Sequence, residues 1–173
     1  MSFKTSSLWS VVLVSAAVLA VALTVWSISP AQQQHRRNAA LLRAARLGQE
    51  PAIEAALNRG ADANCRDGHD LTPLMYAARG DHPNIGNPAP TDNSGAVDLL
   101  LQRGADVNAR TESGFVALFW AARYGHEHTA KLLIAHGADV TAKDKDGMTA
   151  LKWAKTNGQT NVMVLLESAG AKE

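Results

Sequence analysis

The chain has 173 residues and a formal net charge of +1; 46% of its residues are hydrophobic and 19% are charged. This balance excludes wholesale disorder, and it gives no strong electrostatic attraction to nucleic acid. The single cysteine, Cys65, excludes a disulfide framework and a cysteine-ligated zinc or iron–sulfur site. The length allows one ordinary domain or two small ones.

Charged residues are unevenly distributed along the chain. No Asp, Glu, Lys, Arg or His lies between Lys4 and His35, and all sixteen acidic residues come after residue 35. This partition divides the sequence into four parts. They are a short basic N-terminus (residues 1–7), an apolar segment (residues 8–28), a tether (residues 29–37) and a domain (residues 38–173).

The apolar segment Leu8–Ile28 is long enough to cross a membrane as a helix. It contains no charge, Pro or Gly, and at 1.5 Å per residue it spans about 31 Å, the thickness of one hydrocarbon core. It exceeds the roughly 7–15 apolar residues of a cleaved signal, and Trp9 and Trp26 stand near its ends as aromatic belt residues do. We predict a single-pass transmembrane anchor.

Removal of this segment is the alternative. Ser29 and Ala31 are small residues at the minus-three and minus-one positions of a possible cut before Gln32. Cleavage near Ala31 would leave a secreted or periplasmic soluble binder.

The orientation of the segment is ambiguous. Four arginines that follow it favour a cytoplasmic domain by the positive-inside rule. They are Arg36, Arg37, Arg43 and Arg46. A short basic start followed by an apolar segment is, however, the usual arrangement for export. We expect the domain on the exported side of the membrane, periplasmic or extracellular.

The rest of the chain has a period of 33 residues. A Gly-Ala-Asp motif, degenerate in its last copy, begins at Gly60, Gly104, Gly137 and Gly170. A Leu-x-x-Ala motif follows the same spacing from Leu41, Leu74, Leu118 and Leu151. Both series predict four units that each fail to bury an apolar face alone and so stack. The units cover about residues 38–66, 67–110, 111–143 and 144–173, and the second is lengthened by an insertion over residues 80–92.

These residues resemble the ankyrin repeat family. The family unit opens with Thr-Pro-Leu, contains paired alanines and a Gly-His turn, and closes with Gly-Ala-Asp-Val-Asn. This chain has the corresponding segments Thr72-Pro73-Leu74, Ala121-Ala122, Gly125-His126 and Gly104-Ala105-Asp106-Val107-Asn108. The resemblance implies an all-α solenoid of about four stacked helix–turn–helix units with hairpin fingers, here preceded by one transmembrane helix. In the third unit we expect an inner helix over Val116–Ala122 and an outer helix over Glu127–Ala135.

The chain departs from the family pattern at two kinds of position. The motif histidine is replaced by Met75, Phe119 and Lys152, and Val116 replaces the motif threonine, so some side-chain hydrogen bonds of the family are expected to be lost. Asp70 occupies a place in the finger where Gly114 and Gly147 stand in later units. We therefore expect the finger that contains Asp70 to differ in shape.

The insertion at residues 80–92 contains three prolines and two glycines, which favour an exposed loop. Asp81, His82 and Asp92 form a candidate metal cluster there, so a metal-binding or enzymatic loop near His82 is a rival function. His126 and His128 are interpreted as turn residues rather than ligands. The sequence has no phosphate loop, Gly-x-Ser-x-Gly motif or catalytic Cys–His signature. We expect no enzyme activity and no cofactor.

Two rows of large side chains recur at equivalent positions of successive inner helices, and the resemblance implies that these positions face a concave groove. Arginine and aromatic residues are enriched in binding hot spots. The candidate partner-binding residues are Arg43, Arg46, Tyr76, Arg79, Trp120, Arg123 and Trp153. Two alternatives are that arginines stack on aromatic rings within the protein and that the tryptophans pack against the fingers. We expect a monomeric, membrane-anchored adaptor or scaffold that binds an acidic or amphipathic protein segment and no nucleic acid.

Overall fold

The computed structural model describes residues 29–80 and 91–172. The predicted anchor Leu8–Ile28 and residues 81–90 of the predicted insertion lie outside the described residues. Among the helices that the structure describes, none has the length and apolar character needed to cross a membrane. The chain divides into a first unit, Met1–Arg36, and a second unit, Arg37–Glu173.

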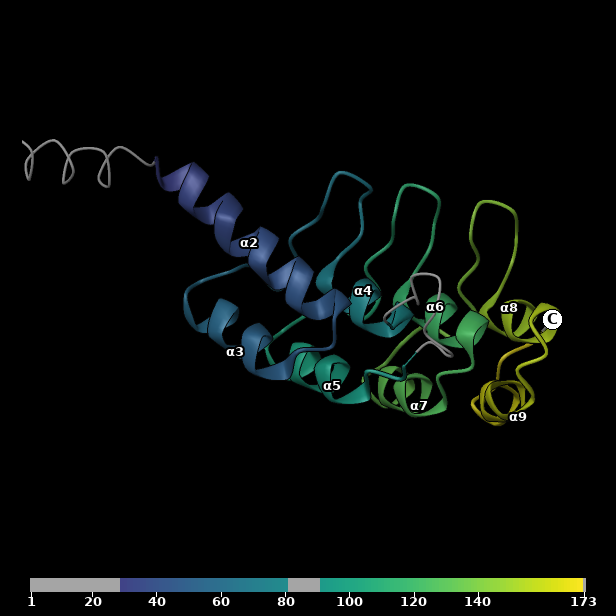
Figure 1. Cartoon of the computed structure of the whole chain (residues 1–173). Helices are drawn as coiled ribbons and strands as arrows, with labels where there is room; N and C mark the ends of the chain where they lie inside the picture. Colours follow the sequence, from purple (N-terminus) through teal and green to yellow (C-terminus); the bar gives the residue numbers. More distant parts are fainter. Residues whose placement is uncertain (1–28, 81–90, 173) are drawn as a thin grey trace, which may run out of the picture. The chain divides into compact units, whose positions relative to one another are not determined.

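Eight helices and no strands make up the described part of the chain (Figure 1). They follow one another as four pairs. The pairs are α2 (Pro30–Arg46) with α3 (Glu50–Asn58), α4 (Pro73–Arg79) with α5 (Ser94–Gln102), α6 (Ala117–Tyr124) with α7 (Glu127–Ala135), and α8 (Ala150–Thr156) with α9 (Thr160–Ser168). Short links at residues 47–49, 125–126 and 157–159 join three of the pairs, and residues 80–93 separate α4 from α5.

Successive pairs stack in two layers. The first helices pack in the order α4, α6, α8, and the second helices pack in the order α3, α5, α7, α9. A hairpin-shaped loop leads into each of α4, α6 and α8, and Figure 1 shows the three loops side by side. We name them the α4 finger (residues 66–71), the α6 finger (residues 110–115) and the α8 finger (residues 143–148). The all-helical arrangement agrees with the expected solenoid.

The third pair can be compared directly with the prediction made for it. The outer helix α7 has the predicted bounds, Glu127–Ala135. The inner helix α6 begins one residue later than predicted, because Val116 is its N-cap, and it continues to Tyr124. It ends at Gly125, which adopts the left-handed conformation (φ 74°) that glycine tolerates best.

Residues 29–37, the predicted tether, are helical from Pro30 onward. Ser29 and Gln32 form a reciprocal capping box at this helix start. The backbone N–H of Gln32 donates to Ser29 Oγ (3.2 Å), and the backbone N–H of Ser29 donates to Gln32 Oε1 (3.2 Å). Pro30 takes the first helical position, where its missing N–H is no loss.

The core is built from small residues on the inner helices and leucines on the outer ones. Paired alanines on α2, α4 and α6 are all at most 4% exposed: Ala44, Ala45, Ala77, Ala78, Ala121 and Ala122. Their small side chains let neighbouring inner helices approach closely. Leu100, Leu133 and Leu166 are fully buried on α5, α7 and α9. Phe119, in the place of the motif histidine, is the largest fully buried side chain among the described residues.

The expected loss of a side-chain hydrogen bond at Val116 is confirmed. Thr72 Oγ1 accepts from the Met75 backbone N–H at the start of α4, and Thr149 Oγ1 accepts from the Lys152 backbone N–H at the start of α8, both at 3.3 Å. Val116 offers α6 no such cap. The first turn of α6 therefore depends more on burial than its two neighbours do.

The expected difference in the α4 finger is not found. Asp70 has φ 63°, in the same left-handed region as Gly114 (φ 81°) and Gly147 (φ 72°). Aspartate tolerates this region because its short side chain can make local hydrogen bonds. Here Asp70 Oδ1 accepts from Arg66 Nη1 at 2.8 Å, and Oδ2 accepts from the Glu112 backbone N–H at 2.7 Å. The substitution thus keeps the turn and adds a contact between two fingers.

Asparagine side chains join successive units below the fingers. Asn64 Nδ2 donates to Gly104 O (3.1 Å), and Asn64 Oδ1 accepts from the Asp106 backbone N–H (2.7 Å). Asn108 makes the equivalent pair of bonds to Gly137 O and the Asp139 backbone N–H, at 3.0 and 2.9 Å. The next position in this series is Thr141, whose hydroxyl instead bonds its neighbour Asp139. The last junction therefore lacks the asparagine bridge.

We expect Thr141→Asn to stabilise the protein by about 1 kcal/mol. The new amide would reach the carbonyl of Gly170 and the backbone N–H of Lys172, which correspond to the partners of Asn108, and a net hydrogen bond contributes about that much. Urea unfolding followed by circular dichroism measures the gain. Thr141→Ala is the matched control, and a Thr141→Asn midpoint at or below that of the natural chain would contradict the prediction.

Candidate partner-binding surface

The side chains predicted to bind a partner form a stacked ladder across three inner helices. Tyr76, Trp120 and Trp153 occupy equivalent positions on α4, α6 and α8, and all three are half-buried. The guanidinium carbon of Arg79 lies 5.2 Å from the ring centroid of Trp120, and that of Arg123 lies 5.1 Å from the ring centroid of Trp153. Each arginine thus covers the aromatic ring of the following unit, and the alternative of internal arginine–aromatic stacking is confirmed.

The first unit contributes less to this ladder. Arg46 is exposed, and it lies close enough to Tyr76 to act electrostatically on its hydroxyl. Arg43 is also exposed, and its side chain has no hydrogen bond, ion pair or ring contact among the described residues. The structure therefore brings together Tyr76, Arg79 and the later members of the two rows, and leaves Arg43 apart.

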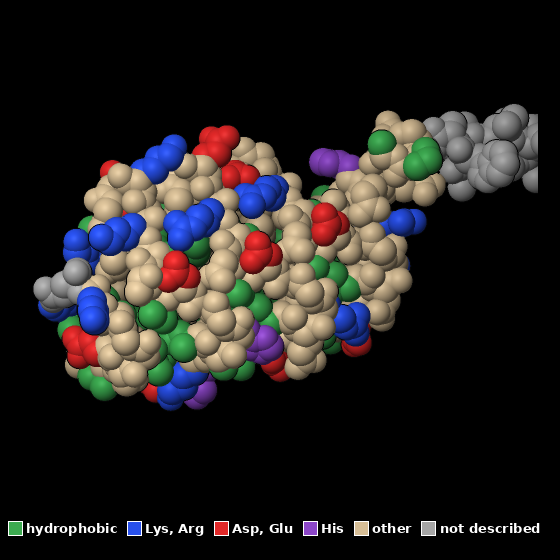
Figure 2. Space-filling model, turned by 180° about the vertical axis from the view of Figure 1, so that it is seen from behind, with side chains coloured by type: hydrophobic (Ala, Val, Ile, Leu, Met, Phe, Trp, Pro, Cys, Tyr) green, Lys and Arg blue, Asp and Glu red, His purple; other side chains and the backbone are tan. Residues whose placement is uncertain are grey.

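The four candidate arginines have no acidic partner among the described residues. The ion pairs found within residues 29–80 and 91–172 involve Arg66, Arg103, Arg110, His128 and Lys131. None of them includes Arg43, Arg46, Arg79 or Arg123. On the face that Figure 2 shows, basic and acidic side chains are interspersed. The inner helices thus present positive charge that the described chain does not neutralise.

Two of the aromatic side chains are tied to the fingers by their polar atoms. Tyr76 Oη donates to Asp67 Oδ2 at 2.5 Å, and Trp153 Nε1 donates to Asp144 Oδ2 at 3.1 Å. Burial first, and then the bond to Asp67, raises the pKa of Tyr76 to about 12. Burial alone raises the pKa of the Asp67 carboxyl, but hydrogen bonds from Tyr76 and from two backbone N–H groups outweigh it and lower that pKa. The alternative that the tryptophans pack against the fingers holds for both Trp120 and Trp153, since the ring of Phe115 in the α6 finger lies against each of them.

Among the described residues, the ring nitrogen of Trp120 makes no such hydrogen bond to its finger. Thr111 stands where the other units have Asp67 and Asp144, and its single side-chain oxygen accepts from the Phe115 backbone N–H at 3.0 Å. Trp120 Nε1 is buried and has no hydrogen-bond partner among the described residues. Sequence reasoning missed this difference, although the signal was present: an acidic residue precedes the aromatic one by nine positions in two units, and a threonine does so in the third.

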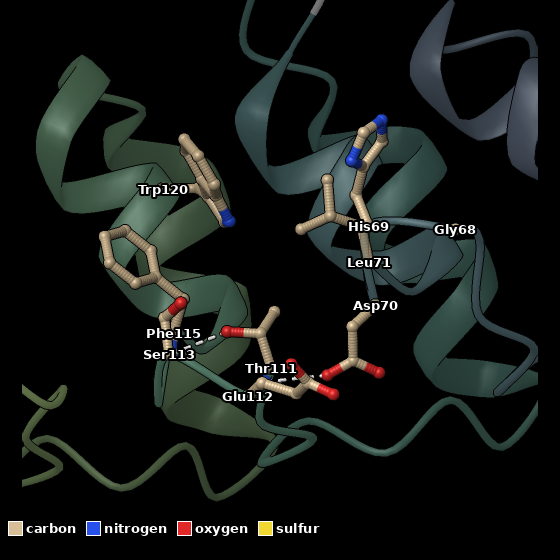
Figure 3. Close-up of a pocket in the computed structure, with 9 residues that line it drawn as sticks. All are labelled: Gly68, His69, Asp70, Leu71, Thr111, Glu112, Ser113, Phe115 and Trp120. Carbon is tan, nitrogen blue, oxygen red and sulfur yellow. Dashed lines mark hydrogen bonds between the residues drawn. The ribbon is translucent and has the colours of Figure 1, made fainter.

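A hollow of about 430 Å³ lies beside Trp120, between the α4 and α6 fingers (Figure 3). Its walls combine aromatic, aliphatic and polar side chains. The lining residues are Gly68, His69, Asp70, Leu71, Thr111, Glu112, Ser113, Phe115 and Trp120. Phe115 packs against the Trp120 ring that forms one wall of the hollow. Its ring centroid lies 5.3 Å from that of Trp120 and 5.4 Å from that of Trp153.

The rival metal site gains no support from the described residues. Asp81 and His82 lie outside them. The carboxylate of Asp92 accepts from the backbone N–H of His128 (3.0 Å) and from Thr129 Oγ1 (2.6 Å), so it caps the start of α7. His126 is 3% exposed and its Nδ1 bonds Ala78 O at 3.0 Å, as a turn residue would. No group of three or more potential ligands among His, Cys, Asp and Glu occurs in the part of the chain that the structure describes.

Cys65 is buried (6% exposed) at the base of the α4 finger. Burial first, and the nearby Asp62 second, raises the pKa of its thiol to about 11. Because thiolate is the reactive form, we expect Cys65 to react with a maleimide or an aromatic disulfide at pH 8 at least tenfold more slowly than a free cysteine, for which the pKa is about 8.5. With the aromatic disulfide, the absorbance of the released aromatic thiol reports the rate. Full reactivity should return in urea, and fast labelling of the folded protein would contradict the prediction.

The fold and this surface define a helical-repeat protein with a ladder of arginine and aromatic side chains on its inner helices. Two family models match the chain, one described as ankyrin repeats (many copies) over residues 41–85 and one as ankyrin repeats (3 copies) over residues 89–172. The chain belongs to the ankyrin repeat family, and its repeats indicate a protein–protein interaction module. No curated protein matches the chain.

Proposed function

We propose that the chain is a membrane-anchored adaptor whose repeats bind an acidic segment of a partner protein. One observation carries the proposal. Arg79 and Arg123 are stacked on tryptophan rings and, like Arg43 and Arg46, have no acidic partner among the described residues.

The stacked arginines are suited to binding carboxylates. A guanidinium group donates two parallel hydrogen bonds to a carboxylate, and a stacked one is already partly immobilised, so less side-chain entropy is lost on binding. Tryptophan and arginine are also the residues on which interface energy concentrates. An acidic peptide laid across α4, α6 and α8 would meet both residue types in each unit that it crosses.

The proposal is tested by panning a displayed library of random dodecapeptides on the full-length chain in detergent. We expect recovered peptides rich in Asp and Glu. Arg79→Gln combined with Arg123→Gln should weaken their binding about 100-fold, since each hot-spot residue contributes about 1–2 kcal/mol. Arg59→Gln with Lys172→Gln removes the same charge from exposed positions elsewhere and serves as the matched control. Peptides without acidic enrichment, or equal loss in the control, would refute the proposal.

The anchor in this proposal is Leu8–Ile28, supported by its charge-free length. Ser29, the residue at the minus-three position of the alternative cleavage site, has a structural use in the capping box with Gln32. We expect the protein in the membrane fraction to have the intact mass of the complete chain, and we expect it to stay there after alkaline extraction. A soluble product shorter by about 31 residues would favour the secreted binder instead.

We place the repeats on the exported side of the membrane. Buried Cys65 cannot report this, so the label belongs on an exposed finger residue, with Lys145→Cys introduced into a Cys65→Ala background. A membrane-impermeant maleimide should label this cysteine on intact cells. Labelling that requires lysis would place the repeats in the cytoplasm. The adaptor role needs no catalysis, cofactor or self-association. We therefore expect the protein to have the mass of a monomer and to show no enzyme activity.

A further inference from the structure

We propose that Trp120 and the hollow beside it form a specific site for one carboxylate of the partner, which takes the place that Asp67 and Asp144 hold in the neighbouring units. This inference rests on the proposed function, because it assigns one acidic side chain of the bound segment to one position. The site is the space between the α4 and α6 fingers.

The comparison between units carries the argument. In the α4 finger, Asp67 Oδ1 accepts from the Leu71 backbone N–H (2.9 Å) while Oδ2 accepts from Tyr76 Oη. In the α8 finger, Asp144 Oδ1 accepts from the Met148 backbone N–H (2.8 Å) while Oδ2 accepts from Trp153 Nε1. In each carboxylate Oδ1 thus serves backbone N–H groups of the finger, two in all, and Oδ2 serves the donor on the ring.

The α6 finger has only one side-chain oxygen at this position for its backbone donor and its ring donor. Thr111 Oγ1 serves the Phe115 backbone N–H, and the indole N–H of Trp120 is left without an acceptor among the described residues. A buried donor without a partner is costly, so an acceptor supplied from outside the chain would be bound favourably. Trp120 occupies the same repeat position on α6 that Tyr76 and Trp153 occupy on α4 and α8.

The charge around this donor selects a carboxylate rather than a neutral carbonyl. Arg79 lies over the Trp120 ring, and no acidic side chain of the described residues pairs with it. A carboxylate has two oxygens, so one can accept from the indole N–H and the other from the guanidinium group. Such charge-assisted bonds are stronger than those to a neutral oxygen.

The two acids that line the hollow leave room for this carboxylate. Asp70 is neutralised by Arg66 at 2.8 Å, and its second oxygen is used by the Glu112 backbone N–H. Figure 3 shows Asp70 and Glu112 together at the end of the hollow away from Trp120, whose indole nitrogen is turned toward Leu71 and His69. The volume of about 430 Å³ is many times the roughly 30 Å³ of a water molecule and accommodates an acidic side chain.

The test uses the peptide acetyl-Gly-Glu-Gly-amide and its Gln counterpart as probes of the full-length chain. Indole N–H signals are followed by ¹H–¹⁵N NMR and assigned with Trp120→Phe and Trp153→Phe. We expect the Glu peptide to shift the Trp120 signal downfield and leave the Trp153 signal in place, and the Gln peptide to do neither at the same concentration. A Trp120 signal that does not move at millimolar Glu peptide would overturn the proposal.

Substitutions at Thr111 test the same site from the protein side. Thr111→Asp supplies the missing acceptor oxygen internally, so it should shift the Trp120 indole signal even without peptide. Its negative charge also repels an incoming carboxylate, so it should weaken binding of the Glu peptide about tenfold or more. Thr111→Ser keeps the single oxygen and should bind as the natural chain does. Trp120→Phe keeps an aromatic ring and removes the indole N–H donor. It should weaken binding of the Glu peptide even if the Thr111→Asp variant does not fold.

The outcomes separate this inference from the proposed function. If acidic dodecapeptides need Arg79 and Arg123 but bind Trp120→Phe and Thr111→Asp as tightly as the natural chain, the carboxylate site is wrong and the acidic-partner adaptor stands. If no acidic peptide is recovered but the Glu peptide still shifts Trp120, the site stands and the extended groove is wrong.

Discussion

Phe119→Ala is expected to lower the free energy of unfolding by about 3–5 kcal/mol, the usual range for a fully buried phenylalanine. Phe119 is 0% exposed, and its ring meets that of Phe115 edge-on with 5.7 Å between centroids. It lies on α6, which packs against α4 on one side and α8 on the other, so the cavity would weaken two junctions between units. Chemical denaturation of the full-length chain, followed by circular dichroism, measures the loss.

Val164→Ala is the control for this variant. Val164 is 62% exposed on α9, and a surface truncation of this kind changes stability by about 0.5 kcal/mol or less. Because repeat proteins are stabilised by contacts between neighbours, the Phe119 variant should also unfold with a broader transition than the control. A loss below about 1.5 kcal/mol would mean that the neighbouring units close over the cavity.

Asp92→Ala is expected to lower the free energy of unfolding by about 2–4 kcal/mol, since the residue makes several charge-assisted hydrogen bonds to another unit. Its carboxylate accepts from the backbone N–H groups of His128 (3.0 Å) and Thr129 (3.4 Å) and from Thr129 Oγ1 (2.6 Å). Thr129 is fully buried, so its hydroxyl would be left without this acceptor. The same unfolding experiment measures the effect.

Two variants calibrate the Asp92 prediction. Asp92→Asn keeps one acceptor oxygen and should lose about half as much. Asp98→Ala removes an acid whose carboxylate bonds only Gln102 on its own helix (2.8 Å), and it should be close to neutral. Equal losses for Asp92→Ala and Asp98→Ala would show that Asp92 does not stabilise α7.

The Asp92 contact also explains how the second unit accommodates its extra residues. A Cβ on Gly80 would lie 2.3 Å from the carbonyl oxygen of Thr91, so the two ends of the predicted insertion meet closely. The chain after them is held by Asp92 at the start of α7. The helix pair α4 and α5 is thereby preserved although ten residues separate the two ends.

The repeat and much of its local structure could be predicted from the sequence. The Gly-Ala-Asp and Leu-x-x-Ala series indicated the four helix pairs, and the bounds of α7 were predicted correctly. Gly60, Gly104, Gly137 and Gly170 all have φ between 84° and 89°, as expected where an outer helix ends. These features depend on the residues of one unit and its period, so a single sequence contains them.

The hydrogen bonds and the stacking of the candidate binding residues could not be predicted in the same way. The sequence placed Tyr76, Trp120 and Trp153 at one repeat position. It did not reveal that Asp67 and Asp144 accept from the polar atoms of two of them, whereas the third has no acceptor in the part of the chain that the structure describes. Nor did it show that Arg79 and Arg123 each cover the ring of the next unit. Both results depend on the spacing between side chains of different loops and helices.

The sequence by itself therefore determined the family, the number of helix pairs and the rows that share a face, because these follow from periodicity and backbone preference. Only the tertiary structure decided that Asp92 caps α7 through the backbone N–H of His128, 36 positions later, and that the Cys65 thiol is buried. It also decided that the indole N–H of Trp120 has no acceptor among the described residues. Hydrogen bonds and burial depend on distances between residues far apart in the chain, and the stacking of the units sets those distances.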